Sequence, residues 1–140
     1  MASANIELVR SIVAAWERGD WSSADWAHPE IEYVVADGPS PGRWIGLMGM
    51  AEGAREVLSA WEDFRFEAGE YRELDDERVL AIVRASGRGR TSGLNVEQMT
   101  ARGAELFHVR EGKVTRLVAY MNFENALADL GLAPDTSELG

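Results

Sequence analysis

The chain has 140 residues and a formal net charge of −10, with 46% hydrophobic and 27% charged residues. This length and composition are typical of one globular domain that can bury a substantial core. The excess of acidic residues disfavours nucleic acid and anionic membranes as partners, because both bind positively charged surfaces.

The complete absence of cysteine excludes disulfides, thiol nucleophiles and thiolate metal sites. The two histidines, His28 and His108, lie far apart and lack the spacing of a metal motif, so we expect neither a metal nor a cofactor. No stretch approaches the ~18 consecutive apolar residues of a membrane span. The N-terminal sequence lacks the basic and apolar regions of a signal peptide, and we therefore expect a cytoplasmic protein.

Hydrophobic periodicity predicts mainly helices in the first half of the chain. Apolar residues recur at helical spacing in two stretches, and serines followed by a proline indicate a short capped helix between them. A β-branched and aromatic run predicts one strand. The expected elements, in order, are helix 6–16 ended by Gly19, short helix 22–26, strand 31–36, loop 37–42, edge strand 43–45 and helix 50–61.

The second half has the alternation that is typical of long antiparallel strands. A hairpin is predicted at Arg110–Lys113, since Gly112 can supply the positive φ that a tight turn needs. Gly103 indicates a bulge in the strand before that hairpin. The expected elements are strands 64–67, 71–74, 79–86, 96–109 and 114–121, then a helix over 124–130 ended by Gly131.

Helices followed by a run of long strands predict an α+β fold. We expect a cone-shaped curved antiparallel β-sheet wrapped around three N-terminal helices. The whole chain, residues 1–140, is expected to form one domain with its core at about 5–132 and a loose tail at 133–140. The space between the helices and the concave face is either filled by side chains or left as a pocket.

Five segments of the sequence carry a resemblance to a known family. They are IELVRSIVAAWERGDW, HPEIEYVVADGPSPGRWIG, AWEDFRFEAGEY, ERVLAIVRASGRGRTSG and ELFHVREGKVTRLVAY. In this order they resemble the SnoaL-like proteins of the nuclear-transport-factor-2-like (cystatin-like α+β) superfamily, over about residues 5–132. That superfamily includes ketosteroid isomerase, limonene epoxide hydrolase and polyketide cyclases, so the resemblance implies the fold and leaves the reaction open.

The resemblance also implies where known reaction centres would lie. Ketosteroid isomerase uses an aspartate base and an oxyanion hole made of a tyrosine and a protonated acid. The base position falls at Val35 and the tyrosine position at Ile12, which cannot do this chemistry, whereas the acid position falls at Glu105, which could. The arginine and two aspartates of epoxide hydrolase fall at three apolar residues, Val83, Ala85 and Ala119.

A functional site is expected on the concave face of the sheet. Strand alternation, with the register that the resemblance implies, turns Glu105 and Tyr33 inward. We predict both as catalytic residues: Glu105 with a pKa raised by burial, as a neutral donor or general acid, or as a base if ionised. The remaining pocket residues are expected to be Trp16, Val35, Trp44, Met99, Phe107, Leu117, Ala119 and Met121.

Several functions are compatible with these residues. One is binding of a small hydrophobic molecule, with cofactor-independent isomerisation, cyclisation or hydrolysis as the reaction if turnover occurs. The alternative is a non-catalytic binding protein, or a structural homodimer whose pocket is filled by its own aromatic residues, with Glu105 paired to an arginine or open to solvent. In each case a homodimer is expected through the outer sheet face, using His108, Val118, Tyr120 and outward arginines.

Overall fold

A computed structural model of the chain describes residues 3–20, 25–37, 41–59, 61–89 and 98–132. Three helices and six strands occur over these residues. In chain order they are α1 (Ala4–Glu17), β1 (Ala27–Val35), β2 (Gly42–Ile45), α2 (Gly46–Ser59), β3 (Trp61–Glu73), β4 (Arg78–Gly89), β5 (Gln98–Arg110), β6 (Lys113–Tyr120) and α3 (Phe123–Leu130).

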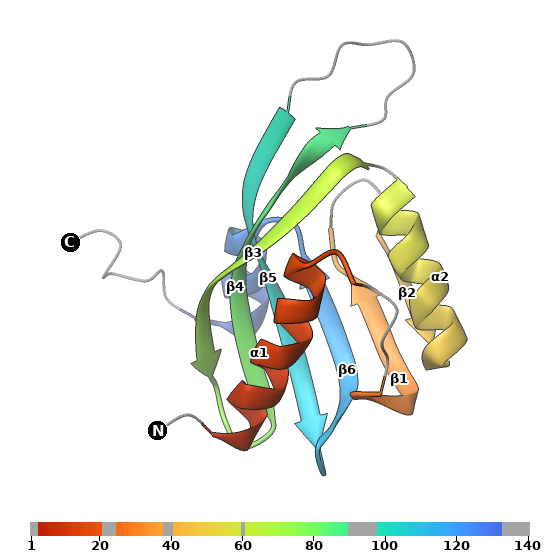
Figure 1. The fold of residues 1–140 in the computed structure, drawn as a ribbon. Coiled ribbons are helices and arrows are strands. Elements are labelled where there is room, and N and C mark those ends of the chain that lie inside the picture. The colour runs from red at the N-terminus through yellow and green to blue at the C-terminus, as the bar shows by residue number, and fades with distance from the viewer. Residues whose placement is uncertain (1–2, 21–24, 38–40, 60, 90–97, 133–140) are drawn as a thin grey trace, which may run out of the picture.

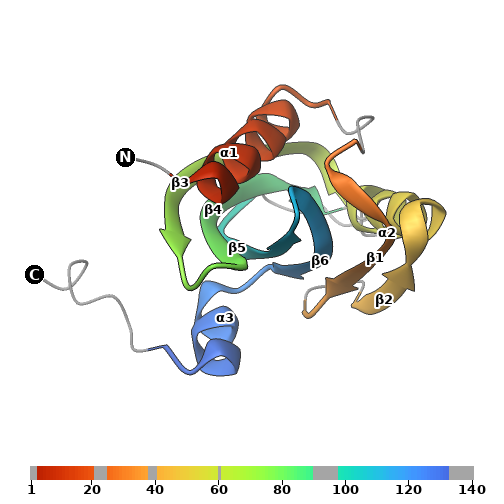
Figure 2. The ribbon, with the colours of Figure 1, turned by 90° about the horizontal axis from the view of Figure 1, so that it is seen from below.

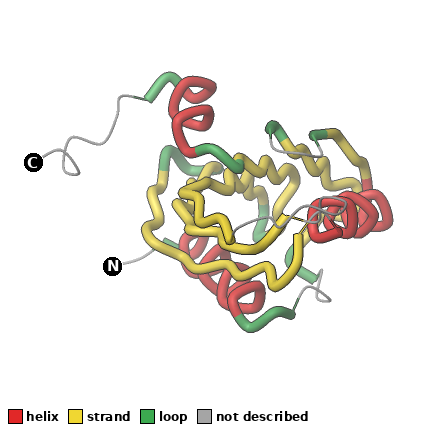
Figure 3. Tube along the Cα trace, turned by 90° about the horizontal axis from the view of Figure 1, so that it is seen from above, coloured by secondary structure: helices red, strands yellow, loops and turns green. Residues whose placement is uncertain are grey.

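The six strands form one sheet in the order β2-β1-β6-β5-β4-β3. The sheet curls strongly without closing, and α1 and α3 lie on opposite sides of it (Figure 1, Figure 2). Seen from the other end, the strands follow an incomplete ring (Figure 3). The predicted α+β cone is therefore confirmed. One pairing differs from a purely antiparallel sheet, because β1 runs parallel to β6.

The first helix forms where the sequence predicts it. The Ser3 side chain accepts a hydrogen bond from the backbone nitrogen of Ile6 at 3.1 Å, which caps the N-terminus of α1. Gly19, with φ of 79°, follows its C-terminal end. The buried face of α1 consists of Val9, Ile12, Val13 and Trp16, and it packs on the concave side of β3 and β4.

The hairpin between β5 and β6 has two residues with positive φ. Gly112 has φ of 77°, as predicted, and Glu111 has φ of 52°. Positive φ at both central residues is the pattern of a type I′ turn, whose twist matches that of the flanking strands. A register shift between His108 and Val109 follows the turn, and beyond this shift Phe107 lies opposite Leu117 and Glu105 opposite Ala119.

Two separate apolar cores lie on the two faces of the sheet. The inner core joins α1 to the concave face and includes Ile31, Phe107 and Leu117. The outer core lies under α3, whose Phe123, Ala126 and Leu127 are buried against the convex face. The side-chain oxygen of Asn122 caps α3, and Gly131, with φ of 67°, ends it.

Several element predictions are wrong in detail. The helix expected at 50–61 spans Gly46–Ser59, and Trp61 begins β3 instead of ending that helix. The two strands expected at 64–67 and 71–74 are one strand interrupted by a register shift between Ala68 and Glu70. Gly103 is not a bulge, because β4 and β5 pair without interruption around it. The glycine is required by close backbone contact, since a Cβ at this position would approach the Tyr120 carbonyl oxygen to 2.5 Å.

The arrangement of the helices also differs from the expectation. Only α1 and α2 precede the long strands among the described residues, and α3 covers the outer face at the other end of the chain (Figure 2). Val118 and Tyr120, expected at a homodimer contact, are 4% and 5% exposed beneath α3. The short helix expected at 22–26 and the tail from 133 lie mostly or wholly outside the described residues, and β1 begins at Ala27.

Candidate functional site

Glu105 lies in the middle of the concave face. It is directly opposite Ala81 on β4 and Ala119 on β6, both of which belong to the inner core. Its exposed fraction is only 8%, and it is the one buried charged or polar residue of the described chain. Because both cross-strand neighbours are alanines, the Glu105 side chain is flanked by methyl groups and not by polar partners.

The Glu105 carboxyl has no protein partner over the part of the chain that the structure describes. Among these residues, the groups that act on its pKa include no hydrogen-bond donor and no cation. Burial raises its pKa well above the usual value of 4.5, and the negative charge of Asp37 raises it further. Glu105 is therefore a neutral carboxylic acid over a wider pH range than an exposed glutamate, with an O–H group available to donate a hydrogen bond.

Tyr33 lies on the same face, one strand beyond β6. It is paired with Leu117 on β6 and with Trp44 on β2, and only 8% of it is exposed. Burial raises the pKa of the Tyr33 hydroxyl, and the charge of ionised Glu105 adds to this rise. Tyr33 therefore remains a neutral phenol at physiological pH, so it can donate a hydrogen bond and does not act as a phenolate base.

Three glycines enclose the half-buried Trp44. A Cβ on Gly53 of α2 would lie 2.6 Å from the Trp44 ring, and a Cβ on Gly42 would also approach this ring to 2.6 Å. A Cβ on Gly49 would lie 3.3 Å from the Trp44 Cβ. Gly49 and Gly53 share one face of α2 because they are four residues apart. This spacing of the two glycines is visible in the sequence, but the aromatic ring that requires it lies on another element.

An aromatic cluster occupies another part of the concave side. The Trp16 ring stacks on Phe107 at 5.9 Å between centroids. It also makes edge contacts with Trp26 at 6.1 Å and with Phe66 at 5.7 Å. A hollow of about 270 Å³ beside this cluster, between the end of α1 and β3, is lined in part by Trp16, Phe64 and Phe66.

The other predicted pocket residues fall into three groups. Val35, Phe107, Leu117 and Ala119 are buried in the inner core. Met121 is partly exposed just after β6. Met99 is the second residue of β5, and its side chain lies outside the described part of the structure. The structure thus brings Glu105, Tyr33, Val35 and Ala119 together on one face, and their roles in binding or catalysis stay predictions.

Asp37 is a polar residue of this region that the sequence analysis did not include in the site. Its carboxylate accepts hydrogen bonds from the backbone nitrogens of Met121 at 2.5 Å and Asn122 at 3.3 Å. It also accepts one from Nδ2 of Asn125 at 2.7 Å. The register that the family resemblance implies predicts an inward Asp37, whereas its bonds to Met121 and Asn125 are visible only in the structure.

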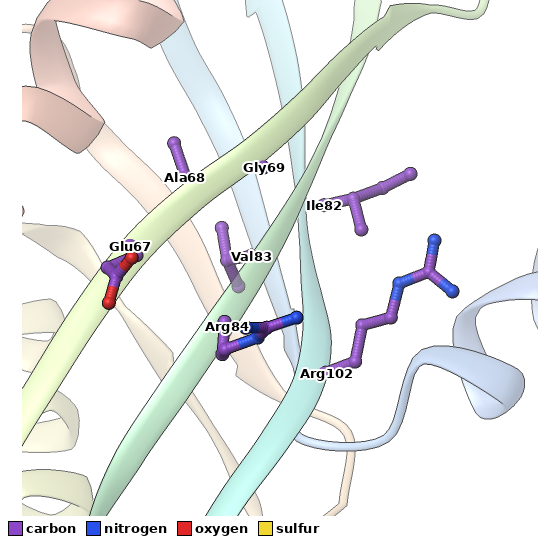
Figure 4. Close-up of a pocket in the computed structure, with 7 residues that line it drawn as sticks. All are labelled: Glu67, Ala68, Gly69, Ile82, Val83, Arg84 and Arg102. Atoms are coloured by element: carbon purple, nitrogen blue, oxygen red, sulfur yellow. The ribbon is translucent and has the colours of Figure 1, made fainter.

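A separate hollow of about 260 Å³ lies across β3, β4 and β5, at the register shift near Gly69. Arg84 and Arg102 are directly opposite each other on β4 and β5. Both side chains extend to the side of Ile82, a residue of the outer core (Figure 4). This hollow is therefore distinct from the inner face that carries Glu105.

Over the described residues, no group of three or more histidine, aspartate or glutamate side chains is placed to hold a metal ion. Within the same residues, no helix is both long enough and apolar enough to span a bilayer.

Comparison with known proteins identifies the family. A sequence profile of the SnoaL-like domain matches residues 9–117. The chain belongs to the SnoaL-like family. No curated protein is detectably similar to this SnoaL-like chain in sequence.

Solved structures of low sequence identity share the fold. An NTF2-like protein of unknown function from Burkholderia pseudomallei K96243 has a TM-score of 0.74 at 17% identity, over 91% of this chain and 97% of that one. TerC, co-crystallised with polyporic acid, has a TM-score of 0.67 at 23% identity, over 91% and 98%. A protein from Xanthomonas campestris pv. campestris, named as a polyketide cyclase candidate, has a TM-score of 0.67 at 23% identity, over 89% and 95%. At these identities the likeness establishes the fold of this SnoaL-like chain and not its reaction.

Proposed function

We propose that this SnoaL-like domain binds a small, largely apolar molecule that carries a hydrogen-bond-accepting oxygen. Binding takes place on the concave face, with the O–H group of neutral Glu105 donating to that oxygen. The observation that carries the proposal is a buried carboxyl, 8% exposed, without a hydrogen-bond partner among the described residues. A largely buried polar group of this kind is costly unless water or a ligand satisfies it, and a ligand oxygen would displace that water.

The surroundings of Glu105 support a ligand that is mainly hydrocarbon. Ala81, Ala119, Val35 and Phe107 are apolar neighbours on the same face. Tyr33 adds a second neutral donor close enough for Glu105 to influence its pKa. A pair of neutral donors in apolar surroundings suits a carbonyl or quinone oxygen.

If turnover occurs, the chemistry that this arrangement favours is proton transfer. A neutral Glu105 can protonate, or hydrogen-bond to, an oxygen on which negative charge develops. That step is common to isomerisations, cyclisations and hydrolyses that need no cofactor. We propose Glu105 as the general acid and Tyr33 as the second donor, on the basis of their shared face and burial.

The binding proposal can be tested with Glu105→Gln and a panel of uncharged steroid, terpene and aromatic ketones. Tryptophan fluorescence and calorimetry would give the affinity of each compound. We expect at least one ketone to bind, with affinity about tenfold weaker in the variant because one hydrogen bond to the ligand is altered. Glu111→Gln, in the exposed hairpin turn, is the matched control and should bind like the parent. Equal affinity of parent and Glu105→Gln for every compound that binds would contradict the proposal.

Turnover can be tested separately with a ketone that binds. With Glu105 hydrogen-bonded to the carbonyl oxygen, a solvent water can remove a proton from the adjacent carbon, and return of a deuteron from deuterated water to that carbon introduces deuterium, which mass spectrometry detects. We expect incorporation with the parent above the uncatalysed rate, and a clear loss with Glu105→Gln. Binding without any incorporation would leave a binding protein and remove the enzymatic part of the proposal.

A second function is favoured by the aromatic cluster. Trp16 stacks on Phe107, and this contact already fills part of the concave side. A structural protein, with the inner face occupied by its own side chains, would have this arrangement. Failure of every ketone in the panel to bind would favour this second function.

We also propose a homodimer through the part of the outer face that α3 leaves open. A row of charged and polar residues crosses four strands there: Glu32, Arg116, His108 and Arg78. The Nε2 atom of His108 is buried and has no hydrogen-bond partner among the described residues, which supports a missing contact at this place. Sedimentation at micromolar concentration should give twice the monomer mass of 15.4 kDa, and a monomer would refute the dimer.

A cytoplasmic location also stays a prediction.

A further inference from the structure

Asp37 is fastened at the end of the parallel pairing between β1 and β6. The backbone nitrogen of Ala36 donates to the Ala119 carbonyl oxygen at 2.9 Å, which continues the pairing beyond Val35. The Asp37 carboxylate then takes the next positions, accepting from the backbone nitrogens of Met121 and Asn122. The side chain of Asn125, in α3, donates to the same carboxylate. Three N–H donors therefore hold the Asp37 carboxylate in one place.

The place at which Asp37 is held lies close to Glu105. Ala119 of β6 is opposite Val35 on one side and opposite Glu105 on the other. Asp37 follows two residues after Val35, just beyond the end of β1. The residue opposite both Val35 and Glu105 is an alanine, so the side chain between the end of β1 and Glu105 in this row is small.

We infer that Asp37 is a positioning residue that keeps Glu105 in its protonated form and thereby selects uncharged ligands over anionic ones. This inference rests on the proposed function. The fixed negative charge of Asp37 opposes a second negative charge on the concave face. That second charge can arise on Glu105 or arrive with a ligand. The ligand class that follows is a neutral ketone, ester or quinone, and not a carboxylate of the same shape.

The electrostatics of the site agree with this geometry. Burial is the larger cause of the raised pKa of Glu105, and the charge of Asp37 is the second cause. Tyr33, from β1, is the other titratable group that interacts with Glu105. The facing positions on β4 and β6 are Ala81 and Ala119, which carry no charge. Over the described residues, no cation contributes to the pKa of the Glu105 carboxyl.

The inference can be tested without any ligand by carbon-13 NMR titration of the Glu105 carboxyl in three proteins. In Asp37→Asn the side-chain oxygen can still accept from Met121 while the charge is gone, and we expect the Glu105 midpoint to fall. In the matched control Asn125→Ala, the attachment to α3 is lost while the Asp37 charge remains, and we expect the midpoint to stay near that of the parent. A folded Asp37→Asn with an unchanged midpoint, or an equal fall in Asn125→Ala, would overturn the inference.

A second measurement uses the parent protein and so does not depend on the variant folding. A carboxylic acid and its methyl ester of the same skeleton are compared at pH 7, with the skeleton taken from a ketone that binds. We expect the ester to bind about tenfold more tightly than the carboxylate, because the latter adds a negative charge near Asp37. Equal affinities would overturn the inference. If no compound binds at all, the proposed function fails, and the NMR titration still decides the effect of Asp37 on Glu105.

Discussion

Tyr33 and Trp44 are paired directly across β1 and β2, with their ring centroids 5.8 Å apart. Gly53 of α2 lies against both rings, since a Cβ there would be 2.6 Å from Trp44 and 2.9 Å from Tyr33. This close approach of a helix backbone to two aromatic rings places Tyr33 relative to Glu105. It is the contact by which α2 supports the candidate site.

The first prediction concerns Gly53→Ala. Helix propensity by itself predicts a gain of about 1 kcal/mol, because alanine is the better helix former. The new methyl group would overlap Trp44 and Tyr33, and such overpacking costs about 1–3 kcal/mol, so we expect a net loss. Urea unfolding measures the change, and Glu52→Ala, at an exposed site on the same helix, should leave stability nearly unchanged. A more stable Gly53→Ala would show that α2 can move away from the two rings.

The second prediction concerns the pH dependence that Glu105 gives to folding. Below pH 4.5, the usual pKa of glutamate, both the folded and the unfolded chain hold this proton. As the pH rises above 4.5, the unfolded chain releases the proton while the folded chain retains it. The free energy of unfolding therefore decreases with rising pH until the raised folded-state pKa is passed.

Glu105→Gln removes this titration. We expect the stability of the variant relative to the parent to increase steadily from pH 4.5 upward, as measured by urea unfolding at a series of pH values. Glu111→Gln, at an exposed site, is the control and should follow the parent. If the free energies of unfolding of the parent and Glu105→Gln differed by the same amount at all pH values, the Glu105 carboxyl would reach solvent.

The third prediction concerns His108 on the outer face. Burial lowers its pKa below 6.5, and the neighbouring charges of Arg116 and Arg78 lower it further, against smaller opposing effects of Asp75 and Glu32. The contribution of neutral His108 to the free energy of unfolding is fully present above pH 6.5. As the pH falls through 6.5, the unfolded chain takes up a proton that the folded chain resists, so stability falls toward the folded-state pKa.

His108→Gln should reduce this loss between pH 7 and pH 5, as followed by thermal unfolding. His28→Gln retains His108 and is therefore expected to keep the loss. If both variants keep the same dependence on pH, the protonation of His108 does not contribute to acid destabilisation.

The fourth prediction concerns Trp16, which is 8% exposed and contacts three aromatic rings. Trp16→Ala removes a large buried side chain, and we expect a loss of about 3–5 kcal/mol. Arg18→Ala, at an exposed site just beyond α1, should change stability by less than about 0.5 kcal/mol. A small loss in Trp16→Ala would mean that the ring mainly borders empty space, which would favour the ligand-binding function over the aromatic-filled alternative.

Much of the fold could be predicted because it depends on residues close together in sequence. The apolar stripe of Val9, Ile12, Val13 and Trp16 requires only helical periodicity, and it forms the buried face of α1. Alternation along β5 was enough to turn Glu105 and Phe107 to the same side. Trp61 was assigned wrongly because apolar spacing alone does not mark where a helix ends and an edge strand begins.

The candidate site was only partly predictable for the same physical reason. Glu105 and Tyr33 are visible as polar interruptions of apolar strands. Gly53 was missed because its importance comes from two rings on other strands. Val118 and Tyr120 were assigned to a homodimer contact because a sequence pattern shows that a face is apolar without showing what covers it.

The sequence by itself determined the apolar stripe of α1, the positive-φ hairpin turn at Gly112 and the shared direction of Glu105 and Phe107. These features follow from periodicity and backbone preferences of neighbouring residues. Only the tertiary structure decided that α3 covers the outer face and that Asp37 bonds to Met121 and Asn125, which are 84 and 88 residues away. Such contacts depend on packing between remote segments, whose relative positions are set by the whole fold and not by local sequence.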